Sequence, residues 1–185
     1  GNMLPRIIVL GANVTKQVKQ LVDFFCKRIY ELQFVDMPEG TRSVAVDRDA
    51  RIVSDYLATN QLKPTHSTYY IVKHATKWSE EAIRVYGTLK GNHNARCSVR
   101  LNGSHFTVEH EYPLGIMKQM VRDKKFKSPD AVVKYMKKYG MPVIVTLEED
   151  AKLRTICRTA YTLKEAEDRY KKAGIVVQKL SLIHI

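Results

Sequence analysis

Apolar residues recur every three or four positions over several parts of the chain. Between residues 5 and 32 this spacing holds for Val14, Val18, Leu21, Val22 and Phe25. Side chains with this spacing share one face of a helix. The same pattern covers roughly 47–59, 79–86 and 114–121. It therefore predicts a mainly helical chain.

Signals at helix ends add further helices in the second half of the chain. Ser128 is a typical N-cap, Pro129 suits the first helical position, and Gly140 ends this helix. Two Thr-x-x-Glu strings have the spacing of a capping box, in which each side chain bonds the other residue's backbone N–H. These strings are Thr146–Glu149 and Thr162–Glu165. Residues 142–146 are apolar and predict a buried strand.

Two runs of alternating apolar and polar residues flank Asn102-Gly103. The runs are 95–101 and 104–110. Asn-Gly between such runs is the strongest short-range signal of a β-hairpin with a type I′ turn. A two-residue turn fixes the register, and this register places Arg96 opposite Glu109. The pattern therefore predicts a β-hairpin over residues 95–110.

Together these elements predict an α+β fold, mainly helical with a small antiparallel sheet, in which the β-hairpin 95–110 is followed by helices. A chain of 185 residues suits a single domain over residues 1–185. Residues 1–40 belong either to its core or to an N-terminal helical arm. We expect the lone Trp78 in the core. The three cysteines, Cys26, Cys97 and Cys157, are expected as buried free thiols, which favours a cytoplasmic location.

The charge balance indicates the kind of partner. The chain has 31 Lys and Arg against 19 Asp and Glu, a formal net charge of +12, and a pI near 9.6. A basic domain of this kind is typical of nucleic-acid binders, because Lys and Arg release the counterions condensed on phosphates. The alternatives are an anionic membrane or protein partner, or no specific partner. No apolar run approaches the ~20 residues that span a bilayer. We therefore expect DNA or RNA as the partner and no membrane.

The densest basic stretch covers residues 118–138. Its candidate nucleic-acid-binding residues are Lys118, Arg122, Lys124, Lys125, Lys127, Lys134, Lys137 and Lys138. Only two aspartates lie among them. The last three lysines share one helical face by their spacing. A solvated helix face is the alternative interpretation of this stretch.

A second candidate site is the string Glu109-His110-Glu111-Tyr112-Pro113, at the end of the second predicted strand. A neutral imidazole can take a proton from water, and a neighbouring carboxylate can hold a divalent metal that stabilises a leaving phosphate oxygen. The Glu-His-x-x-Pro string resembles the Asp/Glu-His-x-x-Pro string that opens the HNH, or ββα-metal, nuclease motif. The resemblance implies that His110 is the general base and that Glu109 helps to hold the metal.

The leading hypothesis is therefore a hydrolase, a metal-dependent nuclease that cleaves phosphodiester bonds of DNA or RNA. Its predicted catalytic residues are His110 and Glu109. The predicted ligands of a Mg²⁺ or Mn²⁺ ion are Glu109, Glu111 and His105. His93 is a further candidate near this centre.

The alternative hypothesis is a non-catalytic DNA- or RNA-binding module, or a subunit of a larger nucleic-acid-processing complex. The HNH pattern continues with an Asn and a second His on the following helix, and residues 114–127 contain neither. This departure favours the alternative. A third hypothesis is a protein–protein adaptor with an incidental charge. The oligomeric state stays open, with a homodimer among the alternatives.

Overall fold

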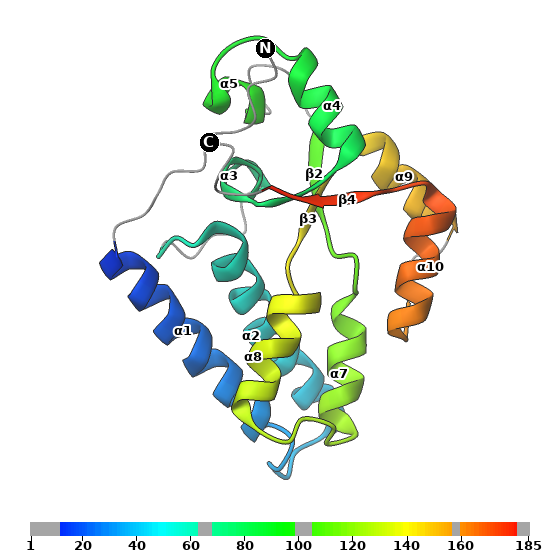
Figure 1. Cartoon of the computed structure of the whole chain (residues 1–185). Helices are drawn as coiled ribbons and strands as arrows, with labels where there is room; N and C mark the ends of the chain where they lie inside the picture. The colour runs from blue at the N-terminus through cyan, green and yellow to red at the C-terminus, as the bar shows by residue number, and fades with distance from the viewer. Residues whose placement is uncertain (1–11, 63–67, 99–104, 157–159, 181–185) are drawn as a thin grey trace.

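The computed structural model describes residues 12–62, 68–98, 105–156 and 160–180 (Figure 1). Over these residues the mainly helical α+β fold is confirmed. The helices are α1 (Ala12–Glu31), α2 (Glu39–Thr59), α3 (Thr68–His74), α4 (Glu80–Thr88), α5 (His93–Cys97), α7 (Leu114–Arg122), α8 (Pro129–Tyr139), α9 (Leu147–Ile156) and α10 (Leu163–Ala173). The strands are β1 (Lys77–Ser79), β2 (Phe106–Glu109), β3 (Val143–Thr146) and β4 (Val177–Lys179).

Helices α1, α2, α7 and α8 pack around one apolar core in the lower half of Figure 1. The apolar stripe predicted within residues 5–32 contributes the side chains of α1 to this core. Its buried residues are Val18, Val22, Cys26 and Ile29. Burying a large apolar side chain contributes about 1.5–3 kcal/mol. Helix α1 is therefore part of the core.

The sheet lies in the other half of the molecule, with the strand order β2-β3-β1-β4. Strands β1 and β3 are parallel, whereas the β2–β3 and β1–β4 pairs are antiparallel. The sheet is mixed and not purely antiparallel as predicted, because β1, which no local strand pattern indicates, joins it in parallel beside β3. Trp78 on β1 is fully buried, as predicted, and its ring packs edge-on against Tyr86 and Phe106.

The predicted β-hairpin over residues 95–110 is wrong in its first strand. Residues His93–Cys97 form the short helix α5. The Asn92 side-chain oxygen caps this helix by accepting a hydrogen bond from the N–H of Ala95 at 2.9 Å. A local cap thus competes successfully with the strand pattern. The Asn102-Gly103 turn lies outside the described residues.

The second predicted strand is present as β2, but its partner is β3. Phe106 lies opposite Thr146 and Glu109 lies opposite Val143. The predicted pairing of Glu109 with Arg96 is therefore wrong. β3 is buried along its whole length, so it offers β2 a long-range partner that a local pattern does not reveal.

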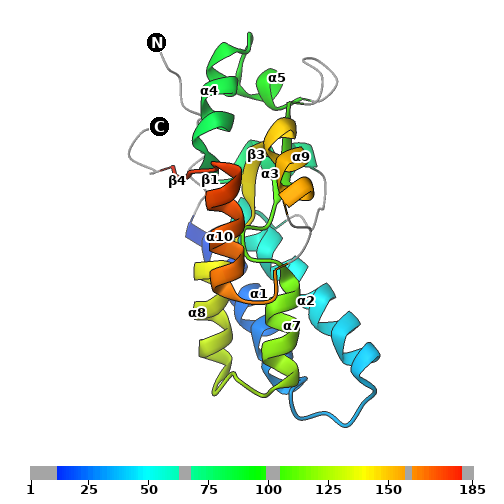
Figure 2. The same ribbon diagram turned by 90° about the vertical axis from the view of Figure 1, so that its right-hand side faces the viewer.

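Strand β2 leads into α7, and α8 leads back into β3, so these two connections between sheet and helices lie side by side (Figures 1 and 2). The predicted caps hold these elements in place. The Ser128 hydroxyl accepts from the N–H of Ala131 at 3.1 Å at the start of α8. After β3, Thr146 and Glu149 form the reciprocal capping box, with bonds of 3.0 and 3.1 Å.

Candidate functional site

The Glu109-His110-Glu111 segment follows β2 and leads into α7. Successive side chains of an extended chain point to opposite sides. Accordingly, His110 contacts Ser54 of α2, whereas Glu109 contacts Arg169 of α10. The structure therefore places the two predicted catalytic side chains next to each other in the chain but against different helices.

The His110 ring is fixed by a buried serine. Its Nε2 lies 3.0 Å from the Ser54 hydroxyl oxygen, and that hydroxyl donates to the Gly140 carbonyl at 2.7 Å. Because a serine hydroxyl has one proton to donate, the Ser54 oxygen accepts from the Nε2–H of His110. Burial, reinforced by the nearby charge of Arg51, lowers the pKa of His110 to about 4. The ring is therefore neutral at pH 7, with Nδ1 as its unprotonated nitrogen.

The Glu109 carboxylate is held by a buried arginine. Arg169, only 5 % exposed, donates from Nη2 to Glu109 Oε1 at 2.7 Å. The same nitrogen donates to the backbone carbonyls of His110 and Glu111, at 3.0 and 3.4 Å. Burial raises the pKa of Glu109 above its usual value, and Arg169 opposes this shift. Arg169 thus fixes the whole segment against α10.

The other predicted metal ligands lie in different surroundings. Glu111 has its carboxylate 3.9 Å from the Lys77 ammonium, and burial raises its pKa. His105 precedes β2, so about 13 Å of extended chain separates it from Glu109. Over the residues that the structure describes, no group of three or more His, Cys, Asp and Glu side chains is arranged to hold a metal ion. The metal ligand set stays a prediction.

His93, the further candidate, lies on α5 and has both ring nitrogens engaged. Its Nδ1 is 2.8 Å from the Tyr86 hydroxyl and its Nε2 is 2.7 Å from the Lys73 carbonyl. A carbonyl only accepts, so Nε2 carries the proton and Nδ1 accepts from Tyr86. This arrangement joins α5 to α3 and α4.

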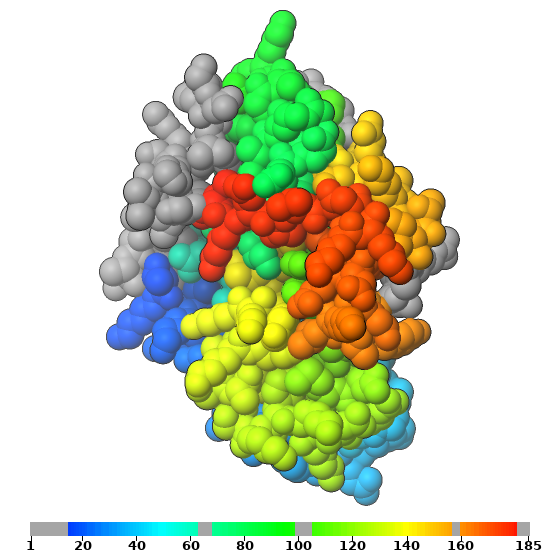
Figure 3. All heavy atoms as spheres, turned by 45° about the vertical axis from the view of Figure 1, so that its right-hand side comes forward, coloured from blue at the N-terminus to red at the C-terminus, as the bar shows by residue number. Residues whose placement is uncertain are grey.

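The eight predicted nucleic-acid-binding residues all lie on α7, on α8 and on the loop between them, which we call the basic hairpin (residues 114–139). Its surface makes up most of the lower end of the molecule in the view of Figure 3, beside the blue segment that leads from α1 into α2. Ion pairs occupy some of these residues: Lys118 with Asp47 at 3.3 Å and Lys134 with Asp130 at 3.2 Å. Within the described residues, no ion pair is formed by Lys124, Lys125, Lys127, Lys137 or Lys138.

The loop of the basic hairpin places a lysine where glycine is usual. After α7 the N–H of Lys125 bonds the Met120 carbonyl at 2.9 Å, and the N–H of Lys124 bonds the Val121 carbonyl at 3.1 Å. This is a Schellman motif, and its left-handed position, with φ 52°, is taken by Lys124. An L-residue with a side chain costs about 1 kcal/mol more there than glycine. The charge is thus kept at the expense of some stability.

A buried glutamine fixes the same loop to the end of α1. The Gln33 amide accepts from the backbone N–H of Phe126 at 3.0 Å and donates to the Phe126 carbonyl at 3.1 Å. It also donates to the Tyr30 carbonyl at 3.1 Å. The lysines on either side of Phe126 are therefore presented by a backbone that is held in one conformation.

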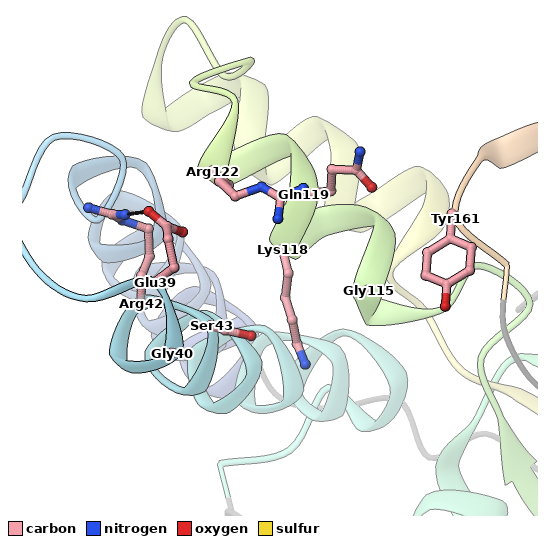
Figure 4. A pocket seen from close by; sticks show the side chains of 9 residues that line it. All are labelled: Glu39, Gly40, Arg42, Ser43, Gly115, Lys118, Gln119, Arg122 and Tyr161. Carbon is pink, nitrogen blue, oxygen red and sulfur yellow. Dashed lines mark hydrogen bonds and ion pairs between the residues drawn. The ribbon is translucent and has the colours of Figure 1, made fainter.

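A pocket of about 390 Å³ opens between the start of α2 and α7 (Figure 4). Lys118 and Arg122 extend from α7 into the pocket. Tyr161 lies at the end of the pocket beyond Gly115. Arg42, which also lines it, bonds Glu39 and donates to the Leu32 carbonyl at 2.9 Å. The volume lies within the ~300–1,000 Å³ of small-molecule sites.

Several residues that contact the candidate sites were not predicted from the sequence. Ser54, Lys77 and Tyr161 carry no local signal of their own. Arg169 did have one, because it stands within the buried stripe of Ala166, Tyr170 and Ala173 on α10. A charged residue on a buried helical face needs a partner.

In comparisons with protein-family models, curated proteins and solved structures, no match to this chain was found. Among the described residues, none of the helices combines the length and the apolar character needed to cross a membrane.

Proposed function

We propose that this protein binds nucleic acid through the basic hairpin, as a binding module or as a subunit of a larger complex. The observation that carries the proposal is the gathering of the eight predicted cations on one pair of connected helices, with its loop lysines exposed and without ion pairs. Such lysines neutralise phosphates and release counterions. The left-handed Lys124 adds support, because strain is retained at functional positions.

The cellular compartment is part of this proposal. Cys26 and Cys97 are buried free thiols, and burial raises the pKa of each to about 12. Thiols of this kind resist oxidation and are typical of reducing compartments. We therefore propose a cytoplasmic location; Cys157 lies outside the described residues.

Replacing Lys124, Lys125 and Lys127 together by glutamine is expected to weaken binding to labelled DNA or RNA oligonucleotides and to reduce its salt dependence. Each phosphate contact contributes about 0.7–0.9 to the slope of log K against log salt concentration, so the loss of three contacts should lower the slope by about 2–3. Fluorescence anisotropy between 50 and 200 mM salt, with EDTA present, measures this slope.

The matched control replaces Lys152, Lys171 and Lys172, three exposed lysines of α9 and α10, by glutamine. It changes the net charge equally, so it should leave most of the slope intact if the basic hairpin is the binding surface. Equal losses in both triple variants would indicate attraction to the overall charge alone. Absence of binding by the unaltered protein would overturn the proposal.

The second candidate function is the metal-dependent nuclease. The free Nδ1 of His110 favours it, because a general base must be unprotonated at working pH; burial, which lowers the pKa of this ring to about 4, also makes it a weaker base than an ordinary histidine. In this mechanism His110 Nδ1 takes the proton of the attacking water. A divalent ion, if bound by Glu109 or Glu111, would supply charge stabilisation for the leaving oxygen; this requires the carboxylate to turn from its present partner, Arg169 or Lys77, toward the His110 side of the chain. The attacking water has to approach Nδ1, because Nε2 already carries a proton and donates it to Ser54.

If the protein is a nuclease, it should cut oligonucleotides in Mg²⁺ or Mn²⁺ but not in EDTA. His110→Gln should lower the rate about 100-fold or more, because general base catalysis contributes at least that factor. His74→Gln is the control, since burial also lowers the pKa of His74 to about 4 and it lies on α3. Lack of any metal-dependent cutting would reject this candidate and leave the binding proposal untouched.

A further inference from the structure

The pocket beside the basic hairpin is a groove that follows one face of α7. Gly115, Lys118, Gln119 and Arg122 line it, and their spacing of three, four and seven residues puts them on one helical stripe. The stripe extends over about 10 Å of helix. One wall of the groove is α2 and the other is α7, and each has a glycine facing free space, Gly40 and Gly115. A Cβ at either position would meet nothing within 4 Å. The groove is thus long enough for an extended ligand.

Tyr161 stands at the end of this groove with an unusually exposed ring. It is 64 % exposed, although it directly precedes Thr162, the N-cap of α10, where an apolar residue often packs back onto the helix. Its backbone is nevertheless fixed, because its N–H donates to the Glu165 carboxylate at 2.9 Å. The backbone that carries this ring is therefore held in place, and the ring face is free to contact a ligand.

Cations and the aromatic ring lie along the same groove. Lys118 and Arg122 project into it one turn apart, while Tyr161 lies beyond Gly115 (Figure 4). The competing acidic partners are Asp47, 3.3 Å from Lys118, and Asp123, 3.8 Å from Arg122. The Arg122 pair is solvent-exposed on both sides, and such pairs contribute little. A phosphate can therefore replace Asp123 beside Arg122 without loss of a strong interaction.

We propose that this groove holds one unstacked nucleotide of a single-stranded nucleic acid, with the base stacked on Tyr161 and the adjoining phosphates paired with Lys118 and Arg122. The inference rests on the proposed function and adds the strand type to it. In a duplex the base faces are covered by neighbouring bases and only their edges are accessible. A ring face beside cations is instead the arrangement by which proteins bind single strands.

The test compares four labelled probes of equal length: a thymidine DNA 12-mer, the same 12-mer with abasic sites, a uridine RNA 12-mer and a blunt DNA duplex. Anisotropy titrations are run at low salt with EDTA. Tyr161→Ala should weaken binding to the two base-bearing single strands about 5- to 140-fold, the usual effect of losing one stacking contact. Its affinity for the abasic strand and for the duplex should change less than twofold.

Two variants act as controls. Tyr161→Phe keeps the ring face and should bind like the unaltered protein. Phe24→Ala removes another exposed aromatic ring, on α1, and should also leave binding unchanged. Because Tyr161 is exposed, its replacement should not alter the thermal unfolding temperature, which circular dichroism checks.

The outcomes separate the two proposals. If Tyr161→Ala binds the base-bearing strands normally, or loses the same factor on the abasic strand, this inference is wrong, while the loop-lysine variants still decide the proposed function. Tighter binding of the duplex than of both single strands would also overturn it. If the unaltered protein binds none of the four probes, both proposals fail.

Discussion

Replacing Arg169 by methionine is expected to lower the free energy of unfolding at pH 7 by about 3–5 kcal/mol, the usual cost of removing one partner from a buried ion pair. The Glu109 carboxylate would lose its 2.7 Å partner, and two backbone carbonyls after β2 would lose a donor. Denaturant unfolding followed by circular dichroism measures the loss.

Two controls make this experiment specific. Arg154→Met removes the partner of Asp150 from an ion pair on α9 whose arginine is 68 % exposed, against 5 % for Arg169, and it should cost less than about 1 kcal/mol. The double variant Glu109→Gln with Arg169→Met removes both charges and should recover much of the stability, because no unpaired buried charge is left.

The same measurement bears on the nuclease candidate. If Arg169→Met costs no more than Arg154→Met, the Glu109 carboxylate does not depend on its arginine and is available to a metal. If the cost is as large as expected, Glu109 has to leave a stabilising partner before it can hold a metal.

Acidification from pH 6.5 to pH 4 is expected to destabilise the fold by way of His110. The folded protein keeps the pKa of this ring at about 4, whereas an unfolded chain protonates it near 6.5. Between these values the unfolded state binds more protons, so stability falls as the pH falls. The difference of about 2.5 pKa units corresponds to about 3 kcal/mol, complete near pH 4.

The measurement is a set of unfolding curves at several pH values for the unaltered protein and for His110→Gln, whose amide can still donate to Ser54. Glu109 and Glu111 have raised pKa values and act in the opposite direction at the lower end of this interval. The difference between the two proteins isolates His110. Parallel pH profiles would mean that the ring is not held neutral by burial.

Local signals in the sequence predicted the helices well, because caps and apolar stripes act within one element. Ser128 caps the N-terminal end of α8, and the Thr146–Glu149 pair caps that of α9, as expected. The partner of β2 was not predictable in this way, since β3 lies more than thirty residues further along the chain. The Asn92 cap, which starts a helix where the hairpin is predicted, is a local feature, but the strand pattern of residues 95–101 points the other way.

The candidate sites show the same difference between local and long-range features. The cations of the basic hairpin are contiguous in sequence, so charge counting found them. The partners of the Glu109 and His110 side chains could not be predicted from local patterns, because Ser54 is 56 residues from His110 and Arg169 is 60 residues from Glu109. Only the fold brings these residues together.

The placement of the basic hairpin between β2 and β3 also bears on how its surface can vary among related chains. Two adjacent antiparallel strands need no more than a two-residue turn, so α7 and α8 stand topologically as an insertion at that turn. Lengthening or exchanging such an insertion leaves the register of the strand pair intact. The helices do pack on α1 and α2. Changes in the basic hairpin would therefore be accompanied by changes in these two helices and in α10, on which Ile116 of α7 packs, while the cluster built around Trp78 stays the same.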